Sequence, residues 1–64
     1  MHRILLTTRR EPVSDRWREA TRAAEGWVLE RQEGVAAGLA ALAQDRWDVW
    51  LVDAALLEEQ AVGG

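Results

Sequence analysis

The 64-residue sequence predicts an α/β fold, a three-stranded parallel sheet of strand order 2-1-3 in a β-α-β-α-β chain, over a single domain of residues 1–64. Three short runs are apolar and rich in strand formers, and the two stretches between them repeat apolar side chains every three or four residues. Strands that alternate with helices of this length imply a parallel sheet with right-handed crossovers.

The first run, Arg3–Thr8, is predicted to be a strand that is covered on both faces. Pro12 suits the first turn of the following helix, because its missing N–H costs nothing there. Ser14 and Asp15 are alternative caps for a slightly later start. Gly26 lies where a glycine ends many helices. Four residues form one apolar face of this helix: Val13, Trp17, Ala20 and Ala24.

The second half of the chain repeats the pattern. Trp27–Gln32 is apolar at first and polar afterwards, as in a strand near a sheet edge. Val35–Gln44 is a second helix; Gly38 in its middle costs about 1 kcal/mol relative to alanine and predicts close packing against a strand. Val49–Val52 is the fully apolar third strand, and Ala54–Gln60 has the composition of a short or frayed helix.

The strand order leaves Val49–Val52 at an edge, where a strand without polar residues is unprotected against pairing. We expect either another copy of the chain or a missing C-terminal half to cover it. Trp50, Leu51 and Trp47 are therefore the interface candidates, because tryptophan is common at binding hot spots. The alternative is that the tryptophans fill a small core.

Composition supports a need for a partner. A chain this short buries only about 60% of its unfolded surface. It has no cysteine, which excludes disulfides and thiolate zinc sites, and His2 is its only histidine. The eight arginines are interleaved with acids at a net charge of −3, which argues against direct nucleic-acid binding. No signal peptide or apolar run of membrane-spanning length occurs, so a cytoplasmic protein is expected.

The order and spacing of these segments resemble the N-terminal half of a response-regulator receiver domain. The residues that carry the resemblance are Ile4–Leu6, Pro12, Arg16–Glu19, Gly26–Val28, Gly34–Leu39 and Asp48–Asp53. In that family the third strand ends on the aspartate that accepts phosphate from a histidine kinase. Asp53 stands at this position, so the resemblance implies that it is phospho-acceptor-like.

Two departures from the family pattern imply a degenerate acidic pocket. Receivers carry an acidic pair after the first strand that binds Mg²⁺, and Thr8 and Arg9 replace it here. Arg9 could substitute for the charge of the metal or simply pair with Asp53. The hydroxyl residue and lysine that later strands supply have no counterpart. The resemblance thus implies an atypical receiver, or pseudo-receiver, without Mg²⁺ or catalysis.

Such a module would belong to two-component signalling, within a response regulator or transcription regulator. It would act through protein–protein contact, as a homodimer or with a histidine kinase or output domain. Two alternatives stay open: a small carrier or leader peptide that ends in Gly63-Gly64, and a fragment of a small α/β enzyme similar to uroporphyrinogen-III synthase. Asp53 could also only cap the helix that follows it.

Overall fold

The computed structural model of the chain describes residues 1–63, with side chains described through Glu58, and confirms the predicted alternation of strands and helices. The three strands are parallel and lie in the order β2-β1-β3, as predicted. The elements are β1 His2–Thr7, α1 Glu11–Ala23, β2 Trp27–Gln32, α2 Val35–Gln44, β3 Val49–Val52 and α3 Ala54–Gly63.

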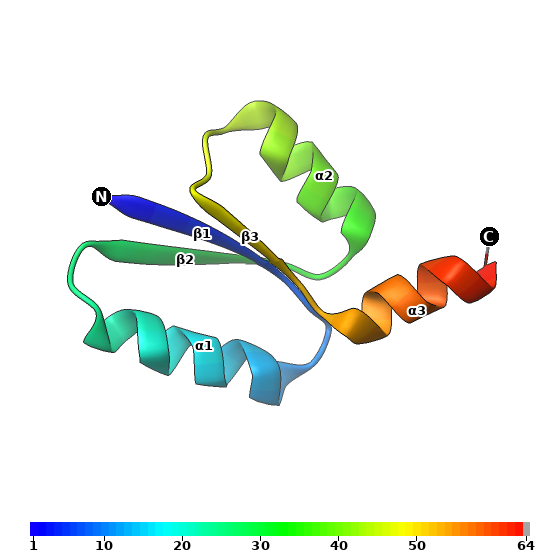
Figure 1. The fold of residues 1–64 in the computed structure, drawn as a ribbon, viewed down its shortest axis with the longest axis horizontal. Helices are drawn as coiled ribbons and strands as arrows, with labels where there is room; N and C mark the ends of the chain where they lie inside the picture. Colours follow the sequence, from blue (N-terminus) through cyan, green and yellow to red (C-terminus); the bar gives the residue numbers. More distant parts are fainter. Residues whose placement is uncertain (64) are drawn as a thin grey trace.

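The elements form three layers, with α1 on one side of the sheet and α2 on the other (Figure 1). Helix α3 starts at the carboxyl end of β3 and leads away from the sheet. Among the helices described, none has the length and apolar character needed to cross a membrane. Among the side chains described, the buried apolar ones are Ile4, Leu5, Leu6 and Leu56, so this core is small and centred on β1.

Successive residues of each strand face opposite helices, which divides the core into two halves. Leu5 is paired with Trp50, and Thr7 with Val52, on the α2 side of the sheet. Ile4 faces α1 and lines a hollow with Trp17 of that helix. Trp17 thus packs on the sheet, as its place on the helix face predicts, although its exposed fraction is 40%.

Gly38 marks the contact of α2 with the sheet, as predicted. A Cβ atom at this position would lie 2.7 Å from Oγ1 of Thr7 and 3.4 Å from Nε1 of Trp50. The Trp50 indole donates a hydrogen bond of 2.9 Å to the same Thr7 oxygen. Because Thr7 is fully buried, no side chain fits between α2 and the sheet here.

The structure shows where α1 begins and ends, and so which of the candidate caps in the sequence it uses. The helix begins at Glu11 with Pro12 in its first turn, so Ser14 is not its cap. Ser14 is instead buried inside the helix, and its hydroxyl has no hydrogen-bond partner among the described residues. Gly26, just after the helix, has a φ of 83°, a left-handed conformation that favours glycine.

Candidate functional site

The candidate site lies where the carboxyl ends of β1 and β3 meet. In a sheet of order 2-1-3 the chain leaves β1 toward one side and reaches β3 on the other, and such switch points are where doubly wound sheets bind ligands. Asp53 directly follows β3, and its backbone N–H donates to the Thr7 carbonyl over 2.9 Å. Its side chain is only 2% exposed, so the carboxylate is inside the protein.

Four hydrogen bonds hold the Asp53 carboxylate. Arg10 grips it with two parallel bonds of 2.7 Å, from Nε to Oδ2 and from Nη2 to Oδ1. The Thr8 hydroxyl donates to Oδ2 over 2.7 Å, and the Ala55 backbone N–H donates to Oδ1 over 3.0 Å. Two carboxylate oxygens offer about four lone-pair positions in total. The hydrogen-bonding capacity of this carboxylate is therefore used up by the protein itself.

The loop between β1 and α1 positions these donors. Thr8 is fully buried at the end of β1, and its oxygen also accepts a hydrogen bond of 3.1 Å from the Arg10 backbone N–H. That bond folds the loop back so that the Arg10 side chain reaches β3. Ala55 belongs to the first turn of α3, and its bond to Asp53 satisfies one of the N–H groups that a helix start leaves unpaired.

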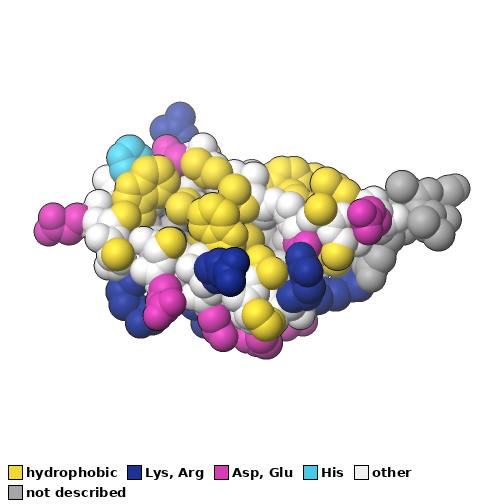
Figure 2. All heavy atoms as spheres, turned by 60° about the horizontal axis from the view of Figure 1, so that its bottom comes forward, with side chains coloured by type: hydrophobic (Ala, Val, Ile, Leu, Met, Phe, Trp, Pro, Cys, Tyr) yellow, Lys and Arg dark blue, Asp and Glu magenta, His cyan; other side chains and the backbone are white. Residues whose placement is uncertain are grey.

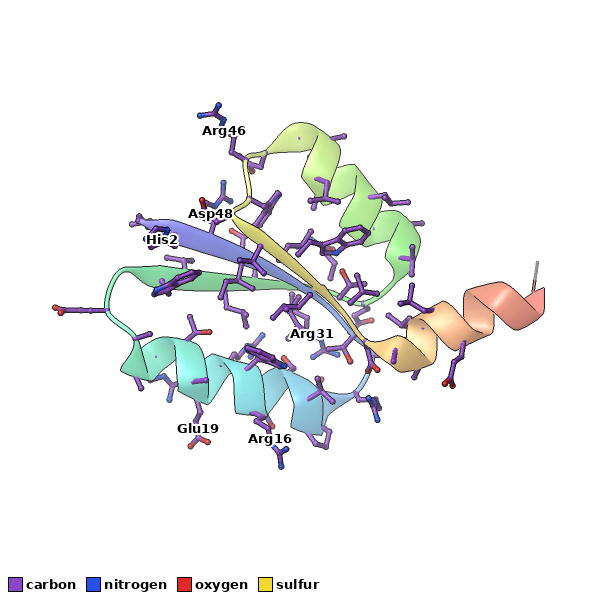
Figure 3. The ribbon with its side chains drawn as sticks, viewed as in Figure 1. His2, Arg16, Glu19, Arg31, Arg46 and Asp48 are labelled. Carbon is purple, nitrogen blue, oxygen red and sulfur yellow. The ribbon has the colours of Figure 1, made fainter. Side chains whose placement is uncertain are left out.

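Arg31, a largely buried arginine of β2, also holds this loop. Arg31 of β2 is 11% exposed, and its Nε donates to the Thr8 carbonyl over 3.2 Å. Its Nη1 donates to Glu11 at the start of α1 over 2.7 Å. Figure 3 shows Arg31 between the sheet and α1. Arg31 thus ties β2, the loop and α1 together around the Asp53 site.

The charge state of the site follows from these contacts. The hydrogen bonds from Arg10, Thr8 and the Ala55 N–H hold the pKa of Asp53 well below its usual range. The same pairing raises the pKa of Arg10 above that of a free guanidinium. Asp53 is therefore an anion at every pH near neutrality. A carboxylate with a lowered pKa is a weak base and a poor nucleophile, because its charge is already stabilised.

This lowered pKa predicts acid sensitivity. In the unfolded chain the Asp53 carboxyl has a pKa of about 3.9, and in the folded chain its pKa is lower. The stabilisation from the ionised carboxylate is therefore complete well above pH 3.9, and it is lost as the pH falls from about 3.9 toward the pKa of the folded chain. We expect urea unfolding midpoints to fall between pH 5 and pH 3, and Asp53→Asn to remove most of this dependence. Glu11→Gln is the control. Arg31 also lowers the pKa of Glu11, but the Glu11 side chain is largely exposed, so this variant should keep most of the acid dependence of the wild type. An equal acid dependence in Asp53→Asn and the wild type would contradict the assignment.

The structure places Thr8 and Arg10 on the Asp53 carboxylate. Thr8 lies against Asp53 as the resemblance implies, but the arginine that pairs with Asp53 is Arg10. The sequence allows Arg9 either to replace the charge of a metal or to pair with Asp53, and the arginine found on this carboxylate is Arg10. Nη2 of Arg9 lies 3.8 Å from the position that a Cβ at Gly34 would take. Two adjacent arginines follow β1, and only the fold of the loop decides which one turns toward β3.

The three interface candidates lie in different surroundings. The Trp50 indole is turned toward α2 and bonds to Thr7. Trp47 donates from Nε1 to the Ala41 carbonyl over 3.0 Å and lies 4.3 Å below the guanidinium of Arg3. Leu51 is half-buried on the α1 side of the edge strand. Contacts within the chain thus hold both tryptophan rings, and all three candidates are half-buried.

A second polar cluster, which sequence reasoning missed, lies at the amino ends of β1 and β3. Arg3 pairs with Asp45 at 3.1 Å and with Glu30 at 3.4 Å, and its backbone N–H donates to Asp48 over 2.7 Å. Figure 3 shows Asp48 beside His2, whose Nδ1 is 3.9 Å from it. An open hollow of about 630 Å³ adjoins the cluster. The Arg3 guanidinium binds Asp45 and its backbone N–H binds Asp48, so the cluster anchors the loop before β3 to β1.

The arrangement around Asp53 offers little to a metal ion or substrate. Within residues 1–58, whose side chains are described, no three histidine, aspartate or glutamate side chains gather closely enough to hold a metal ion. The oxygens of Asp53 are engaged by protein donors, as described above. Comparison of the chain with family models, curated proteins and solved structures finds no match in any of the three.

Proposed function

We propose that this chain is an atypical receiver-like regulatory module that acts through protein–protein contact and does not transfer phosphoryl groups. The observation that carries the proposal is the closed state of the Asp53 carboxylate at the switch point of the sheet. A ligand or phosphoryl group at this position would have to displace Arg10 or Thr8. The Asp53 site therefore holds β1, β3 and α3 together by hydrogen bonds within the protein.

Phosphoryl transfer to a carboxylate needs a free oxygen for attack and a cation that neutralises the charge of the transferring group. Arg10 supplies positive charge, but it does so by occupying both oxygens of Asp53. Its side chain is 60% exposed, so its outer edge faces solvent while its inner edge is bound to the carboxylate. Arg10 thus replaces the cation and blocks the nucleophile at the same time.

The outer edge of β3, which faces away from β1, supports a role in protein–protein contact. β3 carries four apolar residues, and its outer edge has no neighbouring strand in the described part of the chain. Val49 is 37% exposed. A regulatory domain that does not accept a phosphoryl group can still bind a partner through this edge. The partner would be another part of a larger regulator or a second copy of the chain.

Incubation with a small phosphodonor such as acetyl phosphate and Mg²⁺, followed by intact-mass measurement, tests the proposal. We expect no mass gain in the wild type and none in Asp53→Asn, while a phosphorylatable receiver domain run in parallel gains one phosphoryl group. A gain in the wild type that Asp53→Asn abolishes would show that the carboxylate is an acceptor and would overturn the proposal.

The carrier or leader alternative is less well supported by the arrangement of the chain. A carrier of that kind places an apolar strand before its terminal glycines. Here α3 extends through Gly63, and all three strands are parallel. Gly64, on which that alternative depends, lies outside the described residues.

A further inference from the structure

We propose that α1 packs against α1 of a second copy of this chain, antiparallel and side by side, with Trp17 of each copy over Ala20 of the other. This inference deepens the proposed function and rests on it, because it names the partner of the contact role and a surface that binds it. The surface, called the α1 flank below, consists of Val13, Trp17, Ala20 and Ala24.

The apolar side of α1 does not coincide with its buried side. The residue of α1 that is fully buried is Ser14, whose hydroxyl has no hydrogen-bond partner among the described residues. Successive residues of a helix are about 100° apart, so Ser14 lies about 60° from Trp17 and about 120° from Ala20 around the axis. Trp17 is 40% exposed, and Ala20 is exposed. Much of the apolar side of α1 therefore lies outside the core of its own chain.

The α1 flank is turned toward the β3 side of the sheet. Glu11 lies on the opposite side of the helix, where it bonds to Arg31 of β2. Ile4 of β1 lines a hollow with the α1 flank, and Val49 of β3, on the same face of the sheet, is 37% exposed. Figure 2 shows apolar side chains gathered on this side of the molecule. A second helix, at the usual distance of about 8–10 Å from α1, would face this open region.

The sizes of the side chains select an antiparallel second copy. The larger residues, Val13 and Trp17, occupy the first half of the α1 flank, and Ala20 and Ala24 occupy the second half. A two-fold axis that reverses the helix brings the first half of one copy against the second half of the other. The register that places Trp17 over Ala20 also places Val13 over Ala24, because the two pairs share one midpoint in the sequence. Each larger side chain then meets an alanine, whereas a parallel pair would set Trp17 against Trp17.

The charges beside the α1 flank fit the same orientation. Arg16 and Glu19 both point away from the sheet, so they lie along the outer edge of this contact (Figure 3). In the same register Arg16 stands opposite Thr21 of the second copy, two residues from Glu19. Two residues span about 3 Å along a helix, so Arg16 can reach Glu19 of the second copy. Symmetry forms this ion pair twice, and antiparallel helices also bring the opposite ends of their dipoles together.

Ala20→Gln tests the contact, with Ala40→Gln as its matched control. Both alanines are exposed and belong to helices, but Ala40 lies in α2, on the other side of the sheet. Glutamine is a good helix former without charge, so neither variant should disturb the fold, which circular dichroism checks. Sedimentation across a concentration series is expected to give a dimer for the wild type and Ala40→Gln. The Ala20→Gln dimer should be at least about tenfold weaker, because its side chain takes the space of the Trp17 indole at two symmetric places.

Exchange of the two charges tests the orientation. Arg16→Glu and Glu19→Arg each place like charges opposite one another twice in the dimer, so each should weaken it at least about threefold. The double variant restores opposite charges and should restore the affinity of the wild type. An isotope-filtered NOE between the Trp17 indole and the Ala20 methyl group, in a mixture of labelled and unlabelled wild-type copies, should report the register without any substitution.

Several results would overturn the inference. They are a monomer at every concentration, equal dimers for Ala20→Gln and Ala40→Gln, a double charge variant no stronger than the single ones, and filtered NOEs that join Trp17 to residues outside the α1 flank. None of these results bears on Asp53 phosphorylation, which tests the proposed function separately.

Discussion

Substitution of Gly38 by leucine is expected to detach α2 from the sheet and to abolish cooperative unfolding at room temperature. A Cβ at this position would already lie 2.7 Å from the Thr7 hydroxyl, closer than side-chain atoms pack. Thr7 cannot move aside, because it is fully buried and accepts the Trp50 indole N–H. Overpacking of one methylene costs about 1–3 kcal/mol, and leucine adds several carbon atoms to the same contact.

Alanine at the same position separates helix propensity from packing. Gly38→Ala gains about 1 kcal/mol of helix propensity but places its methyl group against Thr7, so we expect a small net destabilisation. Ala37→Leu is the matched control, because Ala37 is the exposed neighbour in α2. Urea unfolding followed by tryptophan fluorescence and circular dichroism measures all three. If Gly38→Leu unfolds at the same urea concentration as Ala37→Leu, the close contact of α2 with the sheet does not exist.

The order of the elements was predictable because each depends on local patterns. The apolar runs of β1 and β3, the helical repeat of α1 and the glycine at 38 each need only their neighbours in the sequence to be recognised. Their correct interpretation fixes the parallel sheet and places Asp53 beside the end of β1. The closed site itself was only half predicted. The sequence indicates an acid, a threonine and an arginine, but the hydrogen bond from the Arg10 N–H to Thr8 decides which arginine turns inward.

The long-range ion pairs were not predictable, for a related reason. Arg3 reaches Asp45 and Glu30, and Arg31 reaches Glu11, across separations that only the assembled sheet creates. Arg3 lies on β1 and Arg31 on β2, and their acidic partners come from other elements. Their long side chains bind through the tip, so the contact depends on distances between strands and loops. Periodicity in the sequence carries no information about such distances.

Removal of the Asp53 carboxylate should have the second large effect, because one side chain there serves three elements. Asp53→Ala leaves the Thr8 hydroxyl and the Ala55 N–H without their acceptor and removes the counter-ion of Arg10. Loss of a helix cap alone lowers the folding equilibrium constant several-fold, and unpaired buried donors add to that loss. We expect the folding equilibrium constant to fall at least about tenfold, and α3 to unfold earlier than in the wild type.

Arg10→Ala provides the comparison that identifies the role of each partner. Arg10 is 60% exposed, so its loss opens no cavity, and Asp53 keeps its bonds to Thr8 and Ala55. Its effect should therefore be smaller than that of Asp53→Ala. The double variant should be little worse than Asp53→Ala, because two residues that act through one contact are not additive. Urea unfolding of the four chains at pH 7 measures this coupling. Fully additive effects would mean that Arg10 and Asp53 stabilise the fold independently, and that the carboxylate at the end of β3 is not held closed by this arginine.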